Sequence, residues 1–71
     1  MDTEYKMACK IRYYRHIKGL NQGELAQALE IKQQHLSKIE CGKIAPNILL
    51  LKKIADILEV TVDDLLKNED V

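Results

Sequence analysis

The chain has 71 residues, of which 46% are hydrophobic and 31% charged, and its 11 basic side chains balance its 11 acidic ones. This length predicts one small domain, because folding at this size removes only about 60% of the unfolded chain's surface from water. Zero net charge excludes a polycation held to nucleic acid by bulk charge. The longest apolar run, 48–51, is far short of a membrane span, and charges interrupt any signal-peptide core. We therefore expect a soluble, cytoplasmic protein with no membrane partner.

Thiols and imidazoles are few, and their spacing argues against a metal site. Cys9, His16, His35 and Cys41 are separated by 7, 19 and 6 residues, without the short pair spacings of zinc ligands. Two cysteines are also too few for a disulfide scaffold, so we expect reduced thiols and neither metal nor cofactor. The sequence has no nucleophile–base motif around Ser37, and we expect no enzyme activity.

The residue pattern predicts an all-α fold with five helices and a folded core over about 3–67. Helices are expected over 3–18, 22–29, 32–41, 48–58 and 62–66, with Gly19 and Gly42 as stops after the first and third. Asn21 with Glu24, Asn47, and Thr61 with Asp64 are the expected N-terminal caps. The residues expected to face the core are Met7, Ile11, Tyr14, Leu25, Ala26, Leu29, Leu36, Ile39, Ile48, Leu51, Ile54, Ala55 and Leu58.

The second and third helices are short and a tight turn of about three residues, 29–31, joins them, which is typical of a helix-turn-helix. In that motif the second of the two helices lies in the major groove of DNA. If Leu36 and Ile39 face inward, then Gln33, Gln34 and Lys38 project from the opposite side. Glutamine can read adenine and lysine can donate to guanine, although the same residues also fit an ordinary solvated helix face.

Four segments in order carry a family resemblance: LNQGELAQ at 20–27, LSKIECGK at 36–43, LKKIA at 51–55 and LEVTVDDLL at 58–66. Together with Pro46 between the second and third segments, they closely resemble the Cro/CI-type (XRE) helix-turn-helix family over about residues 7–66. The resemblance implies a compact five-helix fold like that of the lambda repressor. It also implies a sequence-specific transcriptional regulator, a repressor or autoregulatory controller, that binds a palindromic double-stranded DNA operator as a homodimer. No small-molecule ligand is expected.

The resemblance also implies residue roles. Matching positions in the family read bases, and here they hold Gln33, Gln34, Lys38 and Lys32. Positions that contact phosphates hold Asn21, Gln22, His35 and Lys43, with Lys32 and His35 able to serve either purpose. Arg15 and Glu40 match a buried ion pair that holds the third helix against the first.

Three positions depart from the family pattern. Glu30 stands where the family usually has glycine, so we expect a left-handed residue at a cost of about 1–2 kcal/mol. Lys32 replaces the usual Ser or Thr cap of the third helix. Cys41 replaces a usually polar residue, and we expect it to weaken one phosphate contact.

Apolar residues at usually polar positions predict a dimer contact. Leu49 and Leu50 occupy such positions, and with Ile44 nearby they suggest an exposed patch, to which Leu65 of the fifth helix is added. Local packing of these side chains is the alternative. A protein-interaction module of the same fold without DNA binding is the rival function. Phage repressor, restriction–modification controller and antitoxin-type autoregulator all remain open as biological contexts.

The neutral total charge conceals two halves of opposite sign. Residues 1–43 hold eight basic and five acidic side chains, a formal charge of +3, whereas residues 44–71 hold three basic and six acidic ones, a charge of −3. The helix-turn-helix lies in the cationic half. This distribution predicts weak non-specific binding to DNA, so that affinity depends on base contacts and dimerisation.

Overall fold

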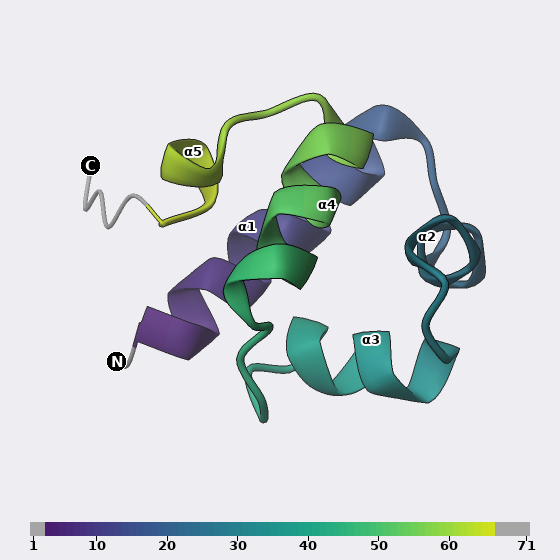
Figure 1. The fold of residues 1–71 in the computed structure, drawn as a ribbon, viewed down its shortest axis with the longest axis horizontal. Helices are drawn as coiled ribbons and strands as arrows, with labels where there is room; N and C mark the ends of the chain where they lie inside the picture. Colours follow the sequence, from purple (N-terminus) through teal and green to yellow (C-terminus); the bar gives the residue numbers. More distant parts are fainter. Residues whose placement is uncertain (1–2, 67–71) are drawn as a thin grey trace.

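The computed structural model describes residues 3–66, which form five helices around one core and contain no strand (Figure 1). The helices are α1 (Thr3–Lys18), α2 (Gln22–Leu29), α3 (Gln33–Glu40), α4 (Ile48–Leu58) and α5 (Val62–Leu66). The predicted all-α class is therefore confirmed. α3 is two residues shorter than expected, because Lys32 and Cys41 are its caps rather than helical residues. Residue 67, the expected end of the core, lies outside the described residues.

The helix ends reflect the local chemistry of the sequence. Gly19 and Gly42 both adopt a φ of +77°, the left-handed conformation that glycine takes without a Cβ clash, and they end α1 and α3. Asn21 and Glu24 form a capping box at α2, with hydrogen bonds of 2.7 and 2.8 Å between side chain and backbone. The Asn47 side chain accepts from the Leu50 N–H at the start of α4.

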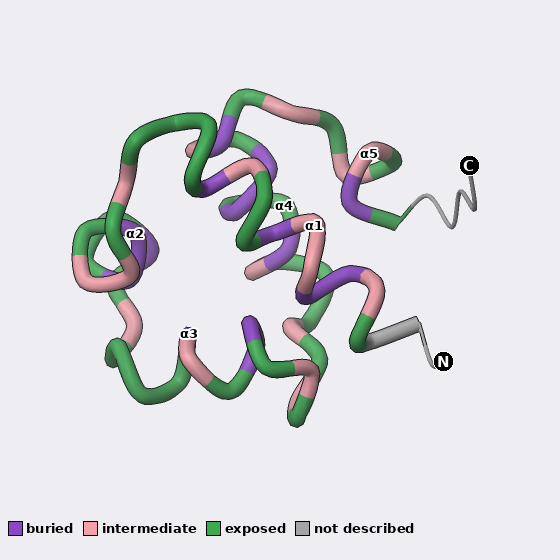
Figure 2. The backbone as a smooth tube through the Cα atoms, turned by 180° about the vertical axis from the view of Figure 1, so that it is seen from behind, coloured by how far each residue is buried: buried purple, intermediate pink, exposed green. Residues whose placement is uncertain are grey.

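The core is made by one face of each helix, as the buried segments in Figure 2 show. Its buried apolar residues are Met7, Ala8, Ile11, Leu25, Ala26, Leu29, Leu36, Ile39, Leu51, Ile54, Ala55, Leu58 and Leu65. Tyr14, expected inside, is half-buried at the edge of this cluster. The helical periodicity thus identified most of the core.

Two expectations about burial were wrong. Ile48, predicted to face inward, is 67% exposed, because it is the first residue of α4 and lies at the margin of that helix's apolar stripe. Leu65, predicted at a dimer contact, is only 1% exposed, because α5 packs on α1 and α4 and turns this side chain into the core. Leu66, its neighbour, is the exposed leucine of α5.

None of the helices in residues 3–66 combines the length and the apolar character that crossing a bilayer requires.

Candidate nucleic-acid interface

A tight turn joins α2 to α3 and sets the direction of α3, which lies along one edge of the molecule (Figure 1). Glu30 has φ 60° and ψ 40°, so the predicted left-handed conformation is confirmed. The Glu30 N–H donates to the Gln27 carbonyl, and the Ile31 N–H donates to the Ala26 carbonyl at 3.0 Å. Ile31 then packs against the core. These contacts close the turn around a residue that lacks glycine's conformational freedom.

α3 has one face for the core and one for solvent. Leu36 and Ile39 are buried, whereas the outer face carries exposed side chains that sequence reasoning marked as base-reading: Lys32, Gln33, Gln34 and Lys38. Gln34 and Lys38, one helical turn apart, lie together on this face. Gln33 lies at its edge towards α2, where it contacts Gln22.

A buried ion pair joins α3 to α1. The Arg15 Nε donates to Glu40 Oε2 at 2.8 Å, and its NH2 group donates to Glu40 Oε1 at 2.9 Å, so the contact is bidentate. The third donor of Arg15 binds the Leu20 carbonyl at 3.0 Å. The two side chains are only 10% and 2% exposed. Removing either of these buried side chains should destabilise the fold, because the other charge would remain buried without a partner.

Two glutamines extend this pair to the surface. Gln22, the first residue of α2, donates through Nε2 to Glu40 Oε1 at 3.2 Å. Gln33, the first residue of α3, donates through Nε2 to Gln22 Oε1 at 3.3 Å. Sequence reasoning assigned Gln22 to a phosphate and missed this link. The only signal in the sequence was that an amide begins each of the two helices.

The start of α3 differs from that of α2 in how its backbone is satisfied. Among the described residues no side chain caps α3, and its N-cap residue is the cation Lys32. The backbone N–H groups of Gln33 and Gln34 therefore have no side-chain acceptor and lie beside a positive charge, and a helix start of this kind suits an anion. At α2 the Asn21 side-chain oxygen is already engaged in the capping box, so Asn21 has its amide nitrogen left to offer.

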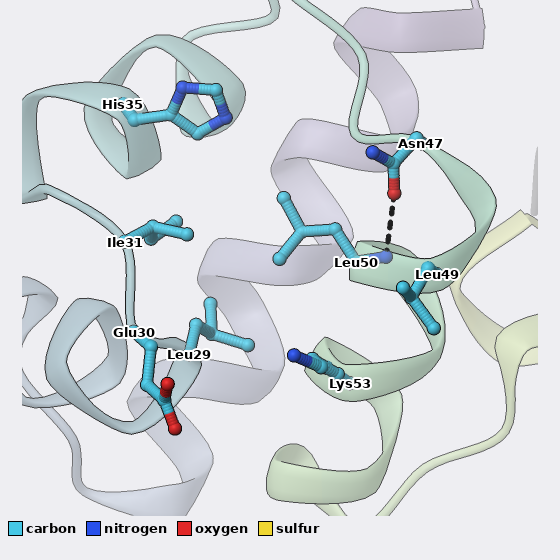
Figure 3. A pocket seen from close by; sticks show the side chains of 8 residues that line it. All are labelled: Leu29, Glu30, Ile31, His35, Asn47, Leu49, Leu50 and Lys53. Atoms are coloured by element: carbon cyan, nitrogen blue, oxygen red, sulfur yellow. Dashed lines mark hydrogen bonds between the residues drawn. The ribbon is translucent and has the colours of Figure 1, made fainter.

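The remaining expected phosphate contacts lie at opposite ends of α3. Lys43 is exposed just after Gly42 and its backbone donates to the Lys38 carbonyl at 3.0 Å. His35 is exposed on the side of α3 that faces α4. It lines a pocket of about 340 Å³ between the α2–α3 turn and α4, opposite Leu50 and Lys53 (Figure 3). Cys41, the C-cap of α3, is an exposed free cysteine.

The residues expected at the dimer contact do not all share one environment. Leu49 is 67% exposed, as is its neighbour Ile48. Ile44 and Leu50 are half-buried and pack against the core, so local packing accounts for part of their surface. We call the exposed pair, Ile48 and Leu49, the α4 patch.

Two short helices joined by a tight turn, the second carrying exposed amides and a lysine on its outer face, define a helix-turn-helix protein. The helix-turn-helix family model matches residues 11–65. An uncharacterised HTH-type transcriptional regulator of Methanocaldococcus jannaschii is 38% identical over 64 residues, covering 90% of this chain and 97% of the relative. The HTH-type transcriptional regulator SinR of Bacillus licheniformis is 36% identical over 62 residues, and the chain spans 56% of its length.

Solved structures agree with the sequence relatives. The clp gene regulator ClgR from Corynebacterium glutamicum superposes with a TM-score of 0.89 at 27% identity, covering 93% of this chain and 70% of that one. The biofilm regulator SinR, solved in complex with DNA, gives a TM-score of 0.81 at 34% identity, covering 86% of this chain and 98% of that one. The chain therefore belongs to the XRE-type helix-turn-helix family of transcriptional regulators. These relatives are regulators and not enzymes.

Proposed function

We propose that this protein is a cytoplasmic, sequence-specific transcriptional regulator that binds a palindromic DNA operator as a homodimer. The observation that carries the proposal is the outer face of α3, where Gln33, Gln34 and Lys38 are exposed while the opposite face is fixed in the core. A helix held this way can enter the major groove as a rigid unit. Repression or autoregulation is the proposed mode of action.

Base reading is assigned to the exposed donors and acceptors of α3. Gln33 and Gln34 can each bind adenine through one donor and one acceptor, and Lys38 can donate to the two acceptors of guanine. Lys32, at the start of α3, reaches a base or the adjacent backbone. Each good base contact discriminates by about 1–3 kcal/mol, so these side chains are enough to define a short half-site.

Phosphate contacts are assigned to the helix starts and flanking polar groups. Gln22 and Asn21 lie at the α2 N-terminus, and His35 and Lys43 flank the outer face of α3. Helix N-termini bind phosphate through their backbone N–H groups, and such contacts fix the protein's register on DNA. The formal charge of +3 over residues 1–43 supports this assignment, because that half of the chain contains all four residues.

The α4 patch is assigned to the dimer contact, with the half-buried Ile44 and Leu50 supporting it. Ile48 and Leu49 are adjacent in the sequence and both 67% exposed, and a contiguous exposed apolar patch is typical of an interaction site. Two copies related by a two-fold axis could cover both patches at once. The half-sites of the operator would then lie about 34 Å apart.

DNA binding is tested by fluorescence anisotropy with a labelled duplex pool at two salt concentrations. Lys38→Ala is compared with Lys52→Ala, which removes the same charge from an exposed position of α4. We expect binding that weakens steeply with salt and that Lys38→Ala reduces more than Lys52→Ala does. No binding at low salt would contradict the proposal and favour the protein-interaction module.

Dimerisation is tested by sedimentation of Ile48→Glu/Leu49→Glu. The control is Ile17→Glu, which charges an equally exposed isoleucine on α1. We expect the double variant to sediment as a monomer and the control to remain a dimer. A double variant that still dimerises would overturn the assignment of the α4 patch.

A further inference from the structure

The pocket of about 340 Å³ between the α2–α3 turn and α4 has an apolar surface (Figure 3). We call it the turn pocket. Leu29, Ile31 and Leu50 form this apolar surface. Leu29 is buried, and the other two are half-buried and pack against the core. The volume falls within the range of about 300–1,000 Å³ that is usual for small-molecule sites.

Two side chains of opposite charge flank this apolar surface. Glu30 comes from the turn and Lys53 from α4, so they reach the pocket from opposite sides (Figure 3). Both residues are exposed. Among residues 3–66, neither forms an ion pair, whether with the other or with a third side chain. The pocket therefore offers one carboxylate and one ammonium group that are both available to a ligand.

The presence of Glu30 at this position is not explained by stability. Its left-handed backbone is strained for a residue with a Cβ atom, and glycine would relieve the strain. Glu59 adopts the same conformation, but its carboxylate is paired with Lys18. The Glu30 carboxylate has no such partner among residues 3–66 and lines the turn pocket instead. Strained residues are found at ligand sites, where binding and not stability accounts for them.

We infer that the turn pocket binds an α-amino acid with an apolar side chain. The ammonium group of the ligand binds Glu30, its carboxylate binds Lys53, and its side chain lies on the apolar surface. His35 and Asn47 line the end of the pocket away from both charges, so the side chain runs towards them (Figure 3). This inference goes beyond the proposed function. It also departs from the expectation, based on the family resemblance, that no small molecule binds.

The two free charges select a zwitterion over simpler ions. A monocarboxylate would pair with Lys53 but place its negative charge beside Glu30, and an amine would have the converse fault with Lys53. A charged group that is covered by a ligand without a partner loses its hydration and gains nothing in return. An amino acid gives each of the two groups a charge-assisted hydrogen bond.

The ligand class is tested by isothermal titration calorimetry of the wild-type chain without DNA. The probes are L-leucine, L-valine and L-phenylalanine. The tightest of them is compared with its N-acetyl derivative, which lacks the ammonium group, and with its amide, which lacks the carboxylate. We expect a dissociation constant of about 1 mM or lower for at least one amino acid, and at least about tenfold weaker binding of both derivatives. No binding of any probe at about 10 mM, or equal binding of the derivatives, would overturn the inference.

The site is located with Lys53→Gln and Glu30→Gln. Lys52→Gln is the control for the first, because it removes the same charge from the preceding, exposed residue of α4. Glu59→Gln is the control for the second, because it removes a carboxylate from the same backbone conformation. We expect each pocket variant to weaken binding of the amino acid at least about tenfold and each control less than about twofold. Pocket variants that bind like the wild type would overturn the inference.

The contact of each charge is tested by combining variants with derivatives. Glu30→Gln should bind the amino acid and its N-acetyl derivative equally, because the ammonium group has lost its partner, whereas Lys53→Gln should keep that preference. General damage to the pocket would weaken both ligands and leave their ratio unchanged. An unchanged ratio in Glu30→Gln would overturn the inference. None of these measurements includes DNA, so they can fail while the proposed function holds.

Discussion

The α2–α3 and α4–α5 junctions have nearly the same backbone. Glu30 and Glu59 both adopt the left-handed conformation, with φ 60° and ψ 40° or 41°. In each, the next residue donates across the helix end, Ile31 to the Ala26 carbonyl and Val60 to the Ala55 carbonyl, both at 3.0 Å. The same left-handed residue, followed by the same backbone hydrogen bond, therefore ends the first helix of both junctions.

The two junctions differ in their side-chain contacts and in how the second helix starts. Glu59 forms an ion pair with Lys18, and α5 begins with a reciprocal Thr61–Asp64 capping box at 3.0 Å in both directions. Glu30 has no ion-pair partner among residues 3–66, and α3 begins at Lys32 without a side-chain cap. The junction whose helix start is left open and cationic is the one that carries the proposed DNA contacts. The junction with a structural role has both a side-chain cap and an ion pair. The junction where DNA binding is proposed has neither among the described residues.

The largest difference between the junctions lies in how their second helices are held. α3 depends on a buried charge at Glu40, whereas α5 is held by apolar burial of Leu65. We expect Glu40→Ala to lower the free energy of unfolding by about 3–5 kcal/mol, because it leaves Arg15 buried and unpaired. Urea denaturation followed by circular dichroism measures this. A loss below about 1 kcal/mol would mean that the pair does not hold α3 in place.

The two left-handed glutamates should respond differently to glycine. Glu30→Gly relieves the backbone strain and should stabilise the protein by about 1 kcal/mol, a rise of roughly 4–8 °C in melting temperature. Glu59→Gly relieves the same strain but removes the contact with Lys18, so its melting temperature should rise less. Calorimetry of both variants decides. An equal or larger rise for Glu59→Gly would remove the distinction between the junctions.

A further pair of variants removes the side-chain cap of α5 and adds one to α3. Thr61→Ala should cost about 0.5–1 kcal/mol, because it removes an existing cap, whereas Lys32→Thr should gain a similar amount by adding one. The added cap also removes a cation from the start of α3, so duplex affinity should fall while stability rises. Thermal unfolding and anisotropy measure the two effects. A Lys32→Thr variant that is no more stable would show that the start of α3 is satisfied in another way.

The smallest expected effect is the pH dependence of the Lys18–Glu59 contact. The hydrogen bond from Lys18, and then its charge, lower the pKa of Glu59 below the ordinary glutamate value. The contact therefore stabilises the protein at pH values above that ordinary pKa and is lost as the pH falls through the lowered one. Lys18→Met should flatten this part of the acid unfolding curve. A curve identical to that of the wild type would exclude the contact as a source of stability.

Most of the fold could be predicted because its signals are local. Asn21, Asn47, Gly19 and Gly42 act through their own backbone neighbourhoods, and they end or begin helices where the sequence places them. Glu30 was also predictable, since the family resemblance showed that glycine was missing from a left-handed turn.

The sequence-based predictions failed where the burial or the contacts of a residue depend on which other part of the chain packs against it. Periodicity places Ile48 near the apolar stripe of α4 but cannot show that, within residues 3–66, no other helix covers that end. In a helix of five residues it also cannot decide which of Leu65 and Leu66 faces inward. The link from Gln22 to Gln33 and Glu40 spans 11 and 18 residues, so it depends on tertiary packing alone.

Selection of binding sites from random duplex DNA shows directly whether the outer face of α3 reads bases in a two-fold operator. We expect enrichment of an inverted repeat whose half-sites are centred about 34 Å apart, with Gln33→Ala and Lys38→Ala each relaxing the preference at a different position. A pool that shows no enriched sequence, or one whose enriched sequence is unaffected by both substitutions, would contradict it.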